Sequence, residues 1–330
     1  MGAASIAGMP ARSERSEVVT EVDGRRLVLS NLEKVLYPEI GLTKGEVIDY
    51  YLRIAPTMLP HLADKALTRV RFPDGVSPGS VTFYEKNKPN GCPDWITTMP
   101  VSTGDGIVDY LVADQVATLV YLANLAALEL HVPQWHGDSA ADRPITVHGT
   151  GDAPSEPLSD TVVIDLDPGE GLTADRLAHA AQLVGGLLAT DGLLPYVKTT
   201  GSKGVQVYAA IEPAPARAVT AYTQSLGALL ARTEPDYFVG TITVAERTGR
   251  VYLDHNQNLA ARNTIAPYSL RGRSWAGVST PMEWDEIAAV RTAEDLRFTP
   301  AEVLQRVDEH GDLFADLLDP VDPPPLPAGK

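Results

Sequence analysis

The segment 162–171, which reads VVIDLDPGEG, constrains this chain more than any other stretch. A run of branched apolar residues leads to Asp165 and Asp167, and a Pro-Gly pair then ends the strand that this run predicts. Successive side chains of a strand point to opposite faces. The two carboxylates therefore share one face of the predicted strand, and Leu166 points to the other.

Two carboxylates side by side repel each other unless something neutralises their charge. The usual partner is a divalent cation held by hard oxygen ligands, often with the phosphates of a substrate completing its shell. Asp254 ends a second apolar segment, 251–254, and adds a third acid. Three strand-borne carboxylates can hold two metal ions, the arrangement used for nucleotidyl transfer. Taken singly, each acid is equally well explained as a solvated strand end.

Four other segments carry groups suited to phosphates or bases. The Gly-framed loop 199–204 (TTGSKG) offers backbone N–H groups, a hydroxyl and an ammonium, although its spacing is not that of a Walker A loop. Segment 268–273 puts two arginines around a turn, and 83–86 joins two aromatic residues to a lysine. His131 follows a predicted helix. Each also has a plain structural explanation, such as a hairpin turn, a surface arginine or a helix-end histidine.

Composition limits the class of protein. The chain has 330 residues and one cysteine, Cys92, which excludes an internal disulfide and a Cys-based zinc site. It has no apolar run of membrane-spanning length and no signal-peptide core, so we expect a cytoplasmic location. The net charge of −16 argues against simple coating of nucleic acid. Residues 191–275 nevertheless hold nine basic and six acidic residues, which leaves room for a local basic surface.

Turn and capping signals divide the chain into elements. An Asp-Gly pair predicts a hairpin over 18–29, and Thr43 with Glu46 forms a capping box for a helix through Arg53. Apolar spacing predicts a helix over 114–130 capped by Asp114. The remaining expectations are a loop over 137–159, helices over 173–190 and 217–232, a mainly helical stretch over 302–318, and strands over 196–200, 205–210, 251–254 and 264–268.

The domain boundaries follow from composition. Residues 1–17 are small and polar and predict a disordered tail. Residues 18–319 are expected to form a single catalytic domain of two intimately packed subdomains. The Pro-rich stretch 320–330 predicts a linker or a free tail.

Read together and in order, the segments HVPQW, VVIDLDPGEG, TTGSKG, VYLDHNQN and TIAPYSLRGR resemble the polymerase domain of the bacterial end-joining enzyme ligase D, in the archaeo-eukaryotic primase superfamily. The upstream segments NLEKVLYP, GLTK, TRVRFP and FYEK extend the resemblance, which runs from about residue 27 to about residue 318. It implies an α/β (α+β) primase-polymerase fold with a central mixed or antiparallel sheet flanked by helices.

The resemblance also implies roles for individual residues. The catalytic, metal-binding carboxylates would be Asp165, Asp167 and Asp254. The residues near the incoming nucleotide and its triphosphate would be His131, Ser202, Lys203, Gln206, Arg271 and Arg71. The residues that contact DNA would be Lys34 and Lys44 at a 5′-phosphate, Phe83 and Tyr84 as a stacking pair, and Lys86 beside them.

The implied activity is template-dependent nucleotidyl transfer to a primer 3′-hydroxyl, at short gaps or breaks in DNA that carry a 5′-phosphate. The implied cofactor is a divalent metal, with Mn²⁺ preferred over Mg²⁺, and both NTP and dNTP are expected as substrates. A separate ligase or end-binding repair protein is an expected partner, because the chain carries no ligase or nuclease module. We expect a monomer that associates with the nucleoid and not with a membrane.

Two residues depart from the family pattern. Gln206 stands where the family carries a histidine beside the triphosphate, and glutamine can donate a hydrogen bond but cannot carry charge. Tyr84 replaces a phenylalanine and keeps the stacking surface. The change at Gln206 leaves open a second function, a module that binds gaps or ends with weak or no catalysis. A third alternative is another metal-dependent nucleotide enzyme, such as a nuclease.

Overall fold

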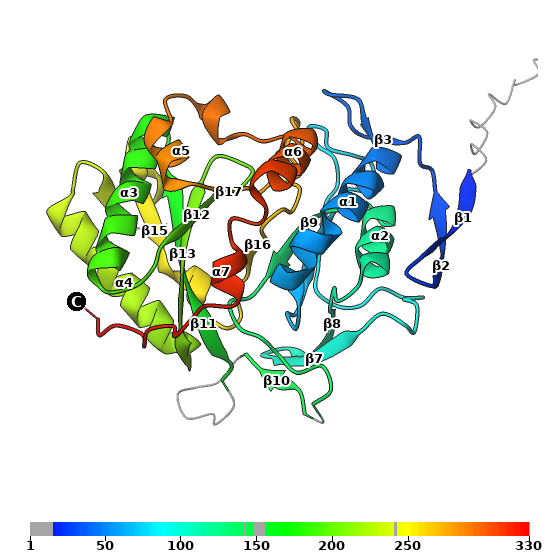
Figure 1. The fold of residues 1–330 in the computed structure, drawn as a ribbon, viewed down its shortest axis with the longest axis horizontal. Helices are drawn as coiled ribbons and strands as arrows, with labels where there is room; N and C mark the ends of the chain where they lie inside the picture. The colour runs from blue at the N-terminus through cyan, green and yellow to red at the C-terminus, as the bar shows by residue number, and fades with distance from the viewer. Residues whose placement is uncertain (1–15, 142, 148–155, 241–242, 330) are drawn as a thin grey trace, which may run out of the picture.

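Two β-sheets stand side by side in this chain, each covered by its own pair of long helices (Figure 1). The computed structural model describes residues 16–141, 143–147, 156–240 and 243–329. Nearly all of the tail expected at 1–17 lies outside the described residues. No helix of the described part is both long and apolar enough to cross a membrane.

The larger sheet has six strands in the order β14-β15-β11-β13-β12-β17. Their bounds are Phe238–Val239, Val251–Asp254, Leu158–Pro168, Val205–Pro215, Tyr196–Thr199 and Pro281–Met282. Only β14 and β15 are parallel, and the other neighbours are antiparallel. This confirms the expected mixed sheet flanked by helices.

The two faces of the larger sheet have different surroundings. Val162, Ile164 and Leu166 of β11 lie in the core cluster that contains helices α3 (Ala174–Thr190) and α4 (Ala216–Thr233). Val163, on the opposite face, belongs to a small cluster with Tyr208 of β13 and with Phe314. Because side chains alternate along a strand, Asp165 shares the face of Val163, away from the two helices.

The smaller sheet has four antiparallel strands in the order β16-β9-β5-β6. Their bounds are Thr264–Ile265, Ala127–Val132, Thr68–Arg71 and Phe83–Glu85. Helices α1 (Lys44–Leu62) and α2 (Val116–Asn124) supply much of the core cluster against this sheet. The capping box of Thr43 and Glu46 is confirmed, and the helix runs beyond Arg53.

Smaller elements surround these two layers. The hairpin expected over 18–29 is confirmed as β1 with β2, and both residues of its turn, Asp23 and Gly24, have positive φ, as a tight hairpin turn requires. The other elements, with the hairpin, have these bounds: β1 Glu17–Val22, β2 Arg25–Ser30, β3 Val35–Tyr37, β4 Leu42–Thr43, β7 Thr98–Thr103, β8 Gly106–Leu111, β10 Ile145–Thr146, η1 Val244–Arg247, η2 His255–Asn258, α5 Trp284–Ala289, η3 Ala293–Leu296, α6 Pro300–His310 and α7 Ala315–Leu318.

The helix expected over 114–130 was wrong in its second half. Helix α2 ends at Asn124, Ala126 has φ of 57°, and strand β9 begins at the next residue. Most of β9 is buried, and periodicity cannot distinguish a strand buried on both faces from a buried helix. Asp114 is not the cap either, since its Oδ2 accepts a hydrogen bond from the hydroxyl of Thr97.

The mainly helical stretch expected over 302–318 is confirmed as α6 and α7, and Gly311, with a φ of 71°, lies between them. Two further expectations need correction. The loop over 137–159 contains β10 and the start of β11, while residues 142 and 148–155 lie outside the described part. The strand over 264–268 stops at Ile265.

The C-terminal segment also differs from a free tail. The carbonyl of Pro324 accepts a hydrogen bond from the amide of Glu212, and Leu326 packs against the core beneath the larger sheet. In Figure 1 the segment runs along the lower edge of that sheet towards α4. Its prolines have no N–H to donate, but their carbonyls still accept, and one of them is used in this way.

Candidate active site

Four polar side chains form a row across the larger sheet. Asp165 of β11 is in register with Asp254 of β15 on one side and with Gln206 of β13 on the other, and Gln206 is in register with Lys198 of β12. Residues directly opposite on antiparallel strands project to the same face. Asp167 follows two residues along β11 and so shares that face. The three expected acids are therefore brought together.

Burial and repulsion between the acids make Asp165 and Asp167 reluctant to ionise. Burial raises the pKa of Asp165 to about 7, the charges of Asp167 and Asp254 add to the rise, and a hydrogen bond from Gln206 opposes it. The pKa of Asp167 is also raised, first by burial and then by Asp254. Such a cluster of hard oxygen donors carries more negative charge than its surroundings offset, which is the chemistry that suits a divalent cation.

The three acids are not arranged as a complete metal site. Within the described residues, no group of three Asp, Glu, His or Cys side chains is arranged to hold a metal ion. Asp167 Oδ2 lies 3.7 Å from a guanidinium nitrogen of Arg247. Asp254 Oδ1 accepts from the backbone and side-chain amides of Asn256, and its Oδ2 accepts from Gln257. The donor set fits a divalent metal, because a carboxylate oxygen that accepts one hydrogen bond, such as Asp254 Oδ2, keeps a second lone pair for an ion.

Lys198 is a member of the row that the sequence did not single out. Its side chain is fully buried, and its Nζ donates to Ser279 Oγ at 2.6 Å. Burial lowers its pKa well below the usual value, against the opposing charge of Asp165. The available signal was a lysine within the apolar strand 196–199, because a lysine is rarely buried without a special environment.

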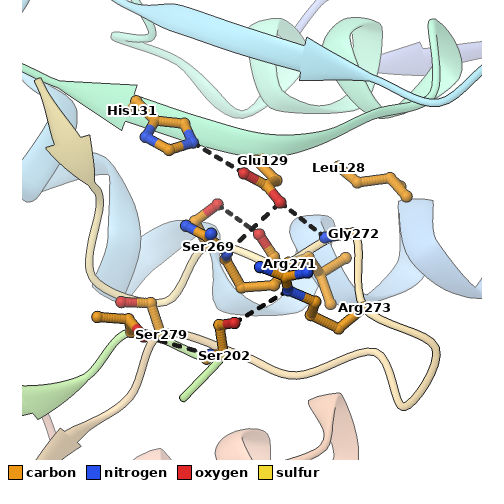
Figure 2. A network of polar contacts seen from close by, with 12 residues as sticks. Leu128, Glu129, His131, Ser202, Ser269, Arg271, Gly272, Arg273 and Ser279 are labelled. Atoms are coloured by element: carbon orange, nitrogen blue, oxygen red, sulfur yellow. Dashed lines mark hydrogen bonds and ion pairs between the residues drawn. The ribbon is translucent and has the colours of Figure 1, made fainter. Parts of the chain in front are cut away.

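A second polar cluster lies on the smaller sheet and the loop after β16. Glu129 and His131 of β9 are two residues apart and so share a face. His131 Nε2 lies 3.0 Å from Glu129 Oε2, and Glu129 Oε1 accepts from the amide of Gly272 at 2.9 Å and pairs with Arg271 at 3.4 Å (Figure 2). Glu129 is therefore the centre that ties the expected nucleotide residues His131 and Arg271 together.

The protonation of this cluster follows from its burial. Burial alone would raise the pKa of Glu129, but the hydrogen bond with His131 and the charge of Arg271 bring it below the usual value. Burial lowers the pKa of His131, with Glu129 opposing that shift. The carboxylate only accepts, so the neutral imidazole carries its proton on Nε2 and donates to it. Sequence reasoning missed Glu129 because it placed this stretch on a helix.

The Gly-framed loop joins the two clusters. Gly201 has φ of 67°, and a Cβ there would lie 2.6 Å from the carbonyl carbon of Val278, so only glycine fits. The next residue, Ser202, accepts through Oγ a hydrogen bond from Arg273 Nε at 2.9 Å (Figure 2). The charge of Lys203 lowers the pKa of Asp167, which places the ammonium near that acid. The loop therefore sets Ser202 and Lys203 between the acids and the arginines.

A cavity of about 290 Å³ opens beside this loop. Ser202, Lys203, Trp275 and Arg297 line it, together with residues 168–174 that follow the catalytic strand. Its wall thus combines cationic and hydroxyl groups with an aromatic ring at the end of β11. These groups suit the phosphates of a nucleotide.

The residues expected to contact DNA lie on the smaller sheet and on the N-terminal segment. Phe83 and Tyr84 of β6 are 43% and 57% exposed, so both rings are available to a ligand and neither is a core residue. The Tyr84 hydroxyl donates to Asn263 Oδ1, and Arg71 lies over the Phe83 ring at 5.6 Å and pairs with Glu85. Lys86 lines a separate cavity of about 210 Å³.

Lys34 and Lys44 are neighbours in space. Lys44 Nζ donates to the carbonyl of Ser30, and Lys34 Nζ donates to the carbonyl of Pro73 at 2.6 Å and pairs with Asp74. Burial lowers the pKa of Lys44 to about 8, and the charge of Lys34 contributes to the shift. The backbone amide of Lys44 donates to the carbonyl of Lys34 at 2.7 Å, so the two lysines are neighbours, and their ammonium groups bond to different carbonyls.

Comparisons with known proteins agree with this geometry. The family model described as the LigD primase-polymerase domain matches residues 43–314. A multifunctional non-homologous end joining protein LigD of Mycolicibacterium smegmatis is 40% identical over 293 residues, and a bifunctional LigD of Bacillus subtilis is 30% identical over 296 residues. A solved structure, the polymerase domain of Mycobacterium tuberculosis ligase D in complex with DNA, aligns with a TM-score of 0.79 at 37% identity and covers 91% of this chain and 99% of that one.

The two LigD proteins are much longer than the matched region. The alignments cover 88% of this chain in both cases, but only 36% of the M. smegmatis protein and 44% of the B. subtilis protein. The likeness therefore concerns one domain of those proteins.

Proposed function

This chain belongs to the LigD primase-polymerase domain family, and we propose that it adds nucleotides, under the direction of a template, to a primer 3′-hydroxyl at short gaps or breaks in DNA that carry a 5′-phosphate. The observation that carries the proposal is the register of β11 and β15, which puts Asp165 opposite Asp254 on the face that also carries Asp167. The family match to a polymerase domain supports nucleotidyl transfer as the chemistry proposed for that cluster.

We propose Asp165, Asp167 and Asp254 as the ligands of one or two divalent ions. Bound metal would lower the pKa of the 3′-hydroxyl and offset negative charge on the leaving group. In the step itself the 3′-oxygen bonds to the α-phosphorus, and the bond from that phosphorus to the bridging oxygen breaks. Pyrophosphate then leaves with the electron pair. Mn²⁺ is the ion we expect to support this reaction best, with Mg²⁺ as a substitute.

The groups around the acids would bind the triphosphate. Lys203 lies near Asp167, and the Ser202 hydroxyl and the loop amides border the same cavity. Arg271 and His131 are fixed by Glu129, so their positions are set before the substrate arrives. Lys203 and Arg271 are the cations of this set, and the neutral His131 helps to hold Glu129, which pairs with Arg271. Preorganised cations stabilise charge that grows on the phosphates in the transition state without having to reorganise.

The DNA ligand would occupy the exposed aromatic pair and the two lysines. Phe83 and Tyr84 offer π-faces for stacking, and Lys34 and Lys44 offer two ammonium groups to a terminal phosphate. We further propose that the protein acts as a monomer near the nucleoid, accepts ribonucleotides, and hands the filled gap to a separate ligase or end-binding protein.

A single assay tests this function. A gapped duplex with a 5′-phosphate is incubated with labelled NTP or dNTP and Mn²⁺, and the primer strand is resolved on a gel. Templated extension by one or a few nucleotides is the expected result. Shortening of the primer would indicate a nuclease, and a shifted but unchanged duplex would indicate a binding module.

A further inference from the structure

Both polar atoms of the Gln206 side-chain amide are hydrogen-bonded inside the protein. Its side chain is 3% exposed, its Nε2 donates to Asp165 Oδ1 at 3.0 Å, and its Oε1 accepts from the hydroxyl of Tyr208 at 3.2 Å. The Tyr208 hydroxyl also lies 3.2 Å from Thr264 Oγ1, which accepts from Gln134 Nε2 at 2.8 Å. A continuous hydrogen-bonded chain therefore runs from the smaller sheet to the acid.

The groups at the two ends of this series of hydrogen bonds give the series a direction. A carboxylate that binds a metal is ionised and only accepts, so the NH₂ group of Gln206 must face Asp165 and its carbonyl oxygen must face Tyr208. At the other end the amide of Gln134 donates to Thr264, whose own proton is then free for Tyr208. Every donor consequently points towards Asp165, and bonds aligned in this way polarise one another.

This series of hydrogen bonds also distinguishes the two carboxylate oxygens of Asp165. Oδ1 is occupied by Gln206, while no donor among the described residues is bonded to Oδ2. A carboxylate held by one oxygen cannot rotate freely, so Oδ2 keeps a fixed direction. The outer partners of a metal ligand commonly act in this manner, and their loss typically weakens metal binding roughly 10- to 100-fold.

We propose that Gln206 and Tyr208 are positioning residues for Asp165, and that position 206 in this protein serves the metal site and not the triphosphate. The inference deepens the proposed function, because it takes Asp165 as a metal ligand. The four side chains come from both sheets, through β13, β16 and the segment that follows β9, so the packing of one sheet on the other orients the ligand.

The test measures Mn²⁺ binding alone, without nucleotide or DNA. The free ion is followed by its electron paramagnetic resonance signal during titration of the full chain. Tyr208→Phe keeps the ring but removes the hydroxyl that holds the Gln206 carbonyl, and Gln206→Leu removes both bonds. We expect each variant to bind Mn²⁺ about tenfold more weakly than the unmodified protein.

Two variants serve as controls. Tyr196 is in register with Tyr208 and packs on the same Phe314 ring, but its hydroxyl takes no part in the chain. Tyr196→Phe should therefore leave Mn²⁺ affinity unchanged. Gln206→His should also keep it close to that of the unmodified protein, because a neutral imidazole can donate to Asp165 from one nitrogen and accept from Tyr208 with the other.

The outcomes separate this inference from the proposed function. Unchanged Mn²⁺ affinity in both Tyr208→Phe and Gln206→Leu, with a raised KM for nucleotide in the second, would assign Gln206 to the triphosphate and overturn the inference alone. Weaker Mn²⁺ binding by the two variants, together with no primer extension by the unmodified protein, would support the inference and refute the proposed polymerase activity. Absence of Mn²⁺ binding to the unmodified protein would overturn both. Melting curves without metal identify a variant that fails to fold, and Thr264→Val then replaces it.

Discussion

Asp165 and Asp254 lie directly opposite each other on neighbouring antiparallel strands, although they are far apart in the sequence. Their separation is fixed by the backbone ladder of β11 and β15 and not by flexible loops. Burial raises the pKa of Asp165 to about 7, and the charges of Asp167 and then of Asp254 add to the rise. The arrangement of these acids on the sheet therefore favours the binding of a cation.

Replacing Asp165 or Asp167 with alanine should abolish nucleotide addition, by a factor of about 10³ or more, in line with the loss of a group that stabilises the transition state. Affinity for the gapped duplex should be preserved, because the acids are proposed to hold metal and not the DNA. Primer extension in Mn²⁺ and a gel-shift titration measure the two quantities.

The matched control is Asp308→Ala, which removes one negative charge from an exposed position on α6. It should leave both extension and duplex affinity unchanged. Near-normal extension by either Asp165→Ala or Asp167→Ala would refute the assignment of the metal ligands.

Local patterns sufficed to predict the strands that carry the acids. Alternation and the Pro-Gly pair predicted that Asp165 and Asp167 share a face, and the burial of Leu166 on the opposite face is confirmed. The capping box at Thr43 and the hairpin turn at Asp23 were likewise readable, because each depends on residues only a few positions apart.

The parts that sequence reasoning missed depend on pairing between distant segments. Nothing local indicates that Lys198 is in register with Gln206, or that Glu129 faces the loop of Arg271. The error over 114–130 has the same origin, because β9 is buried by neighbours from elsewhere in the chain and lacks the alternation of a half-exposed strand. The placement of Gln206 beside the triphosphate came from the family resemblance, whereas the structure bonds its amide to Asp165.

Glu129→Ala should damage both stability and nucleotide use. The change leaves Arg271, His131 and the amide of Gly272 without their shared acceptor in a buried site. Breaking a buried pair by removing one partner costs about 3–5 kcal/mol. We expect a loss near the lower end of this range, because Arg271 keeps some contact with water. Denaturant unfolding measures it, and a raised KM for nucleotide is the kinetic signature.

Asp49→Ala is the control for this prediction. It also removes a carboxylate paired with an arginine, Arg53, but on an exposed surface. Exposed pairs contribute about 0–1 kcal/mol, so stability and KM should barely change. Equal effects of the two substitutions would mean that Glu129 does not organise the site.

Lys34 and Lys44 should make the protein prefer gaps that carry a 5′-phosphate over gaps that end in a 5′-hydroxyl. A terminal phosphate bears more negative charge than an internal diester, so two ammonium groups can distinguish it by charge alone. The preference should weaken with salt, since the exposed charge of Lys34 is screened over about 10 Å in 0.1 M electrolyte. Binding titrations with the two duplexes at low and high salt measure it.

The double variant Lys34→Ala, Lys44→Ala should lose this preference. The variant Arg53→Ala, Arg232→Ala removes the same charge from exposed positions on α1 and α4 and should keep it. Equal binding of both duplexes by the unmodified protein at low salt would rule out the phosphate site, and so would a preference that survives in the lysine variant.

The last prediction is that the 5′-phosphate preference depends on pH through Lys44. Burial and the charge of Lys34 lower the pKa of Lys44 to about 8, so the free protein loses this proton as pH rises through 8. A phosphate dianion binds the protonated form, and a terminal phosphate is a dianion above a pH of about 6. The preference should therefore be greatest between pH 6 and 8 and fall above 8, with proton uptake on binding. Lys44→Arg should abolish that fall, because guanidinium does not titrate in this range. Lys34→Ala should move it to higher pH, since one source of the lowered pKa is removed. A preference that stays constant from pH 7 to 10 in the unmodified protein would show that Lys44 does not meet the phosphate.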